Sequence, residues 1–106
     1  MILSSGKIST SVNPDGIPEQ QRIYTADQDV RITFMQFVSE NPTDVTMNIS
    51  LVLYTDEVRV IPKDTELKPT NILQFDVNYE LTDGEYVFVT SNTNNVINYI
   101  VRGDYI

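Results

Sequence analysis

The sequence predicts an all-β fold: a single antiparallel β-sandwich of about seven or eight short strands with jelly-roll or immunoglobulin-like Greek-key connections. Residues 30–34 and 45–51 alternate apolar and polar side chains, as strands with one buried face do. Between them, residues 40–44 read Glu-Asn-Pro-Thr-Asp, which is typical of a turn. No window combines apolar residues at helical spacing with capping residues, so we expect no helix beyond a single turn.

The chain has 106 residues, which are enough for one domain and too few for two. We expect the sandwich to occupy residues 21–106. Residues 1–20 are polar and rich in turn formers, and neither Pro14 nor Pro18 can donate to a β-ladder. They predict an extended N-terminal arm, in which residues 7–12 could form an edge strand. The arm could pack on its own domain or reach a neighbour.

The strand that begins at Val30 changes its pattern part of the way along. Val30, Ile32 and Phe34 share one face, whereas Met35 and Phe37 fall on the opposite face. Either a β-bulge shifts the phase of the strand, or both faces are covered at that end.

The other strands follow from alternation and from the turn residues that bound them. The cleanest apolar stripe runs from Val45 to Leu53, and the almost continuous apolar segment at residues 86–90 predicts a central strand. Residues 64–71 form a polar connection, and Asp83-Gly84 marks a turn. These remaining strands are expected at residues 21–25, 45–53, 58–60, 73–79, 86–90 and 96–101.

The composition argues against several functions. The net charge is −8, from 15 acidic and 7 basic residues, and this disfavours nucleic-acid binding, which relies on Lys and Arg. The absence of His and Cys removes the most common general base, the most common metal ligand and the cysteine nucleophile. No apolar run approaches the roughly 20 residues of a membrane span, and the first residues lack the regions of a signal peptide. We therefore predict a non-enzymatic protein without cofactor, nucleic-acid partner or membrane partner.

Three short motifs remain as candidates for chemistry. Asp27 with Asp29, and Asp83 with Glu85, are the closest carboxylate pairs for a glycosidase or a calcium site. Both pairs lie in turns, where acidic residues are common for local reasons, so we predict no catalytic or metal site there. Residues 102–104 spell Arg-Gly-Asp, the tripeptide that integrins recognise in some adhesive proteins. Because it ends the last strand, we interpret its glycine as a bulge or turn residue.

Several apolar residues fall outside the regular stripes and call for another partner. A sandwich has one inner face per sheet, so apolar residues on the opposite faces are covered by loops of the same chain or by another protein. Under the second interpretation, the predicted interface residues are Met35, Phe37, Tyr54, Val96 and Ile100.

Seven segments follow one another as strands and turns in a recognisable order: residues 23–25, 30–33, 37–43, 45–51, 61–67, 79–87 and 96–103. In this order they resemble the small β-sandwich virion proteins of tailed bacteriophages. The resemblance covers residues 22–106.

This resemblance implies a structural role without catalysis: a capsid decoration subunit, a head-fibre protein or a neck- or tail-associated subunit. It implies that the chain assembles with itself, for example as a trimer, and docks on the major capsid protein or another virion protein. Such a protein is made in the host cytoplasm and resides in the virion, on the capsid surface or at the neck or tail.

The alternative is a carbohydrate-binding sandwich used in host attachment. Carbohydrate sites usually need aromatic side chains exposed on one face, and this chain has six Tyr and no Trp. Tyr54 and Tyr99 are the candidate platforms under this alternative.

Overall fold

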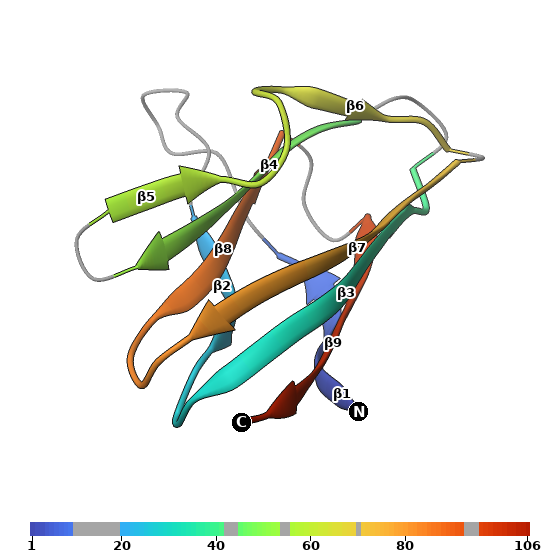
Figure 1. Ribbon diagram of the computed structural model, residues 1–106. Helices are drawn as coiled ribbons and strands as arrows, with labels where there is room; N and C mark the ends of the chain where they lie inside the picture. Colours follow the sequence, from blue (N-terminus) through green and yellow to red (C-terminus); the bar gives the residue numbers. More distant parts are fainter. Residues whose placement is uncertain (10–19, 42–44, 54–55, 70, 93–95) are drawn as a thin grey trace.

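The computed structural model describes residues 1–9, 20–41, 45–53, 56–69, 71–92 and 96–106 (Figure 1). The predicted class is confirmed: the described residues form two antiparallel sheets packed face to face and contain no helix. The strands are β1 (Ile2–Ile8), β2 (Gln21–Thr25), β3 (Val30–Ser39), β4 (Val45–Leu53), β5 (Asp56–Arg59), β6 (Thr65–Leu67), β7 (Ile72–Leu81), β8 (Tyr86–Ser91) and β9 (Ile97–Tyr105).

The strand order is that of a jelly roll. One sheet has the order β1-β9-β3-β7, and the other has the order β2-β8-β4-β5, with β6 also paired to β4. The pairs β1/β9, β2/β8, β3/β7 and β4/β5 are all antiparallel, as in one long hairpin whose two arms are rolled into a sandwich. Contacts of β9 with β3 and of β8 with β4 close the roll. This selects the jelly roll over the immunoglobulin-like alternative.

The hydrophobic core lies between the two sheets. Val45, Met47 and Ile49 of β4 are fully buried, as their regular alternation predicts. Val87 and Val89 of β8 join them, and β8 lies between β2 and β4, which confirms it as an inner strand. The four-stranded sheet supplies Ile8, Val30, Ile32, Met35, Phe37, Ile97 and Val101.

A bulge in β3 explains why the alternation of that strand changes. The register of β3 against β9 shifts between Ile32 and Phe34, so Thr33 is an extra residue on β3. Ile32 and Met35 therefore both point inward, although an odd number of positions separates them. Phe34, which the sequence placed on the same face as Ile32, lies on the outer face instead. The bulge alternative is thus the correct one.

The edge strand β7 has a second bulge beside the first. Between the pairs Ile32–Tyr79 and Phe34–Asp76, β7 carries one more residue than β3. A bulge bends a strand and increases its twist, so two adjacent bulges splay this edge of the sheet. The inner row of β7 is accordingly only half-buried against the core; it consists of Leu73, Phe75, Val77 and Tyr79.

The N-terminal prediction needs a correction. Residues 2–8 form β1 and pair with β9, so they belong to the sandwich instead of preceding it as an arm. The expected edge strand at residues 7–12 therefore starts too late, and residues 10–19 lie outside the described part. The Met1 ammonium donates to the Gly103 carbonyl at 3.1 Å, which places the first residue beside the last strand. The polar connection at residues 64–71 also contains a short strand, β6, which the sequence did not predict.

Candidate functional site

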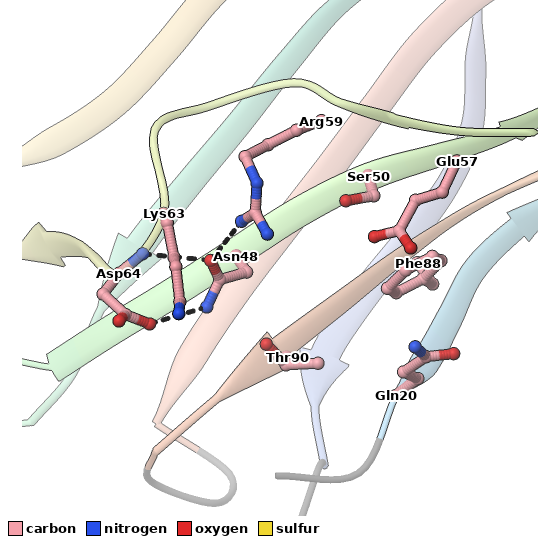
Figure 2. A pocket seen from close by; sticks show the side chains of 9 residues that line it. All are labelled: Gln20, Asn48, Ser50, Glu57, Arg59, Lys63, Asp64, Phe88 and Thr90. Carbon is pink, nitrogen blue, oxygen red and sulfur yellow. Dashed lines mark hydrogen bonds between the residues drawn. The ribbon is translucent and has the colours of Figure 1, made fainter.

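Two surfaces of the sandwich carry features beyond ordinary solvated strands, and they lie on opposite sheets. The first is an outer apolar patch on the four-stranded sheet, composed of Phe34, Val38, Ile72 and Ile100. The second is a polar groove on the five-stranded sheet, shown in Figure 2. Its lining residues are Gln20, Asn48, Ser50, Glu57, Arg59, Lys63, Asp64, Phe88 and Thr90.

The outer apolar patch spans three neighbouring strands. Val38 of β3 pairs with Ile72 of β7, and Gln36 pairs with Ile100 of β9. Phe34 lies one step along β3 on the same face, with the Arg102 guanidinium carbon 5.8 Å from the centre of its ring. Ile72 is 57% exposed, and the other three members are half-buried. The patch is thus accessible from solvent, with Gln36 between Phe34 and Val38 on the same face of β3.

Ion pairs bound this patch at its two ends. The Arg31 guanidinium contacts the Glu80 carboxylate at 2.7 Å, between β3 and β7. At the other end, the Lys7 ammonium donates to the Glu40 carboxylate at 2.8 Å. Hydrogen bonds from Lys7 and Asn98, together with the Lys7 charge, hold the pKa of Glu40 below its usual value. Apolar side chains rimmed by charged ones are typical of a protein interface.

The polar groove is built from cross-strand neighbours on its floor and a loop at one end. Asn48 pairs with Thr90, and Ser50 pairs with both Phe88 and Arg59. These outward-facing residues of β4, β5 and β8 form the base of a hollow of about 410 Å³.

A hydrogen-bonded cluster organises one end of the groove around Asn48 (Figure 2). The Asn48 Oδ1 atom accepts from Arg59 Nη1 at 2.5 Å and from the Asp64 backbone N–H at 3.0 Å. The Asn48 Nδ2 group donates to the Asp64 carboxylate at 3.1 Å. Asp64 has a φ of 54°, a left-handed conformation that Asp tolerates better than most residues. The cluster fixes the β5–β6 loop over the sheet.

The structure contradicts part of the predicted interface. Met35 and Phe37 are fully buried between the sheets, so they cannot contact a partner, and their assignment to an interface is wrong. Ile100 faces outward within the outer apolar patch, and Val96 is half-buried against the core. For both residues, an interface role stays a prediction. Tyr54 lies outside the described residues.

The candidate motifs resolve into structural roles in three cases. The Glu85 carboxylate accepts from the Thr82 backbone N–H and hydroxyl, both at 2.7 Å, and so closes the turn that Asp83 was predicted to form. Gly103 lies inside β9 and pairs with Ile32, opposite the β3 bulge, so its interpretation as a bulge or turn residue is wrong: the extra residue is Thr33 on β3. Tyr99 is only 8% exposed, with its hydroxyl 3.3 Å from that of Ser4. The prediction that Tyr99 is an exposed platform for a carbohydrate is therefore wrong.

Sequence reasoning missed the polar groove as a site. Asn48 and Ser50 were recognised only as the polar face of a strand, and Asp64 only as part of a connection. Outward-facing polar residues look alike in a sequence whether they face bulk water or line a hollow, so no signal distinguished them.

The described residues contain no group of three or more acidic side chains placed to hold a metal ion. No helix in the described ranges is long and apolar enough to cross a membrane.

Comparisons with protein-family models, with curated proteins and with solved structures find no match for this chain.

Proposed function

We propose that this protein is a structural virion subunit of a tailed phage, most specifically a capsid decoration protein. In this role it assembles with itself through the outer face of its four-stranded sheet and docks on the shell. The sequence resemblance suggests the class of particle, and the outer apolar patch is the single structural observation that carries the assembly.

The patch has the chemistry that an assembly surface needs. Phe34, Val38, Ile72 and Ile100 present apolar area on the outer face of one sheet, and burying apolar area is the main driving force of association. Among the described strands, β7 pairs only with β3, so its other edge is available beside the patch. A second copy placed there would cover both features at once.

The fold is compatible with this role by analogy alone. Jelly rolls occur in viral capsid domains as well as in lectins, so the architecture allows a virion subunit without singling it out. The net charge of −8 favours a place on the outer surface of a particle, since packaged phosphates would repel an acidic lining.

Size-exclusion chromatography with light scattering tests the self-assembly. We expect a defined oligomer for the wild type and a monomer for Ile100→Asp, because a charge within the patch is costly to bury. Thr25→Asp adds the same charge at an exposed position of the other sheet and should leave the oligomer intact. A wild type that stays monomeric at high concentration, or an equal effect of the two variants, would contradict assembly through this face.

The virion role needs a separate measurement. Shells of the phage that encodes this chain, prepared without it, are mixed with purified protein and sedimented. We expect saturable co-sedimentation with the shells. Protein that stays in the supernatant, together with its absence from purified particles by mass spectrometry, would contradict a virion location.

A further inference from the structure

We propose that the polar groove on the five-stranded sheet binds a short saccharide. The groove lies on the sheet opposite the outer apolar patch, so the site is independent of the proposed assembly and goes beyond it. The Ser50 hydroxyl, the balance of charges in the lining and its almost entirely polar surface together select this class of ligand.

Ser50 supplies a buried hydroxyl at the floor of the groove. The residue is only 1% exposed, and its side chain lines the hollow in Figure 2. No hydrogen bond to this hydroxyl occurs among the described residues. A serine hydroxyl both donates and accepts, so a ligand hydroxyl at the floor of the groove can pair with it in either direction.

The lining of the groove balances its charges. It contains two cations, Arg59 and Lys63, and two carboxylates, Glu57 and Asp64, in a chain whose net charge is −8. A polyphosphate would meet both carboxylates and be repelled. A neutral ligand with many hydroxyl groups finds donors and acceptors on both sides, because hydroxyl groups both donate and accept.

The cluster around Asn48 presents these groups in fixed positions. Arg59 and Asp64 are both hydrogen-bonded to Asn48, so they do not have to be ordered when a ligand arrives. The Lys63 ammonium has no ion-pair partner among the described residues and is free to bind a ligand hydroxyl or a single sugar carboxylate.

The size and apolar content of the groove agree with a sugar better than with a peptide. Its volume of about 410 Å³ lies within the roughly 300–1,000 Å³ of small-molecule sites. Phe88 is the only apolar residue among the described residues of the lining, and it is 4% exposed, so the groove presents almost entirely polar groups to a ligand. An apolar peptide side chain would find too little contact.

A glycan array probed with the full chain tests the proposal. The array should carry neutral oligosaccharides next to matched uronic acid and sialic acid glycans. It then distinguishes binding of a neutral sugar from binding of a sugar that carries a carboxylate. Titration of the best glycan by NMR then measures the affinity. We expect Ser50→Ala and Lys63→Ala to weaken binding roughly tenfold each, the loss of one hydrogen bond, with chemical-shift changes at β4 and β8. Lys68→Ala, the same change at an exposed position outside the groove, should bind as the wild type does.

Two results would overturn the inference. One is the absence of any array signal together with no NMR shift change at millimolar concentrations of the array's monosaccharides. The other is a bound glycan whose affinity is the same in Ser50→Ala, Lys63→Ala and Lys68→Ala. Because the groove variants lie on the opposite sheet, light scattering should show their oligomeric state unchanged, which separates this test from that of the proposed function.

Discussion

The long inner strands β3 and β4 both alternate apolar and polar residues in the sequence, but they pair with their neighbours in different ways. In β4, Val45, Met47 and Ile49 point inward without interruption, and β4 pairs with β8 in one continuous register. In β3, the register shifts between Ile32 and Phe34 against both of its neighbours. Period-two alternation therefore predicts which side chains are buried only as long as pairing is regular, and one bulge inverts every later residue of the strand.

The largest effect is expected from a substitution on β9 that disturbs the bulge of β3. A Cβ atom on Gly103 would lie 2.0 Å from the Arg31 backbone oxygen, and the Gly103 N–H also donates to Met1. Because the obstacle is backbone, the strands must separate. We expect Gly103→Ala to cost about 5 kcal/mol or more of unfolding free energy, enough to lose the fold.

Gly84 offers a matched control for this substitution. It has a φ of 90° in the turn between β7 and β8, and an added Cβ would meet nothing within 4 Å. Gly84→Ala should therefore cost only about 1–2 kcal/mol, from the left-handed backbone conformation. Urea denaturation followed by circular dichroism measures both variants. Equal losses in the two variants would mean that the close approach of β3 and β9 at Gly103 is not as described.

A pair of phenylalanine variants tests directly which side chains of β3 point into the core beyond the bulge. Phe37 is fully buried beyond the bulge, whereas Phe34 is outside the core on the opposite face. Phe37→Ala should cost about 3–5 kcal/mol, as for a core aromatic residue. Phe34→Ala should cost below about 1 kcal/mol, as at a surface position.

The same urea denaturation resolves the phenylalanine pair. Met47→Ala in the regular strand β4 provides the reference for a buried side chain, at about 2–5 kcal/mol. The reverse order, with Phe34→Ala the more damaging of the pair, would restore the simple alternation and contradict the bulge.

Most of the fold was predictable from the sequence because it depends on local patterning. The stripe of β4, the turn closed by Glu85 and the inner position of β8 all follow from residues close together in the chain. The bulge was visible only as a broken alternation at Met35, with two explanations left open. Choosing between them needs the register against β9, which is about 65 residues away in the chain and is set by tertiary pairing.

The candidate surfaces were less predictable for the same reason. The sequence correctly indicated apolar residues on an outer face, but only Ile100 of its candidates is seen to lie in the outer apolar patch. Phe34 and Ile72 were assigned elsewhere, because the bulge moved Phe34 outward and Ile72 lay just before the predicted strand. The polar groove depends on Asn48, Arg59 and Asp64 meeting across two strands and a loop, which no local pattern encodes.

A smaller effect is expected at the bulge of the other sheet. The register of β2 against β8 shifts between Arg22 and Tyr24, which makes Ile23 an extra residue whose carbonyl accepts from the Ser4 hydroxyl of the facing sheet. Beside it, the Tyr24 hydroxyl oxygen is buried without a hydrogen-bond partner among the described residues. Burial raises the pKa of Tyr24 above its usual value, and the charges of Tyr105 and Asp27 raise it further.

Tyr24→Phe removes this unpaired hydroxyl and keeps the ring. We expect the variant to be as stable as the wild type or more stable by up to about 1 kcal/mol, in contrast to the losses at the β3 bulge. Thermal unfolding followed by circular dichroism provides the measurement. A clear loss of stability would show that the hydroxyl has a partner in solution and that this bulge is held by it.

The smallest effect concerns the end of β3, where Glu40 joins β1 and β9 to the strand. Its carboxylate accepts from Lys7 and Asn98, and these contacts lower its pKa in the folded state. A lowered folded pKa means that the stabilisation is present above the pKa of the unfolded chain and disappears as the pH falls through the folded value. Glu40→Gln should therefore lower the urea midpoint slightly at neutral pH and leave it unchanged in acid, where wild type and variant converge. Because Glu40 is exposed, added salt should shrink the difference. A difference that persists in acid would show that the end of β3 is held by packing and not by this carboxylate.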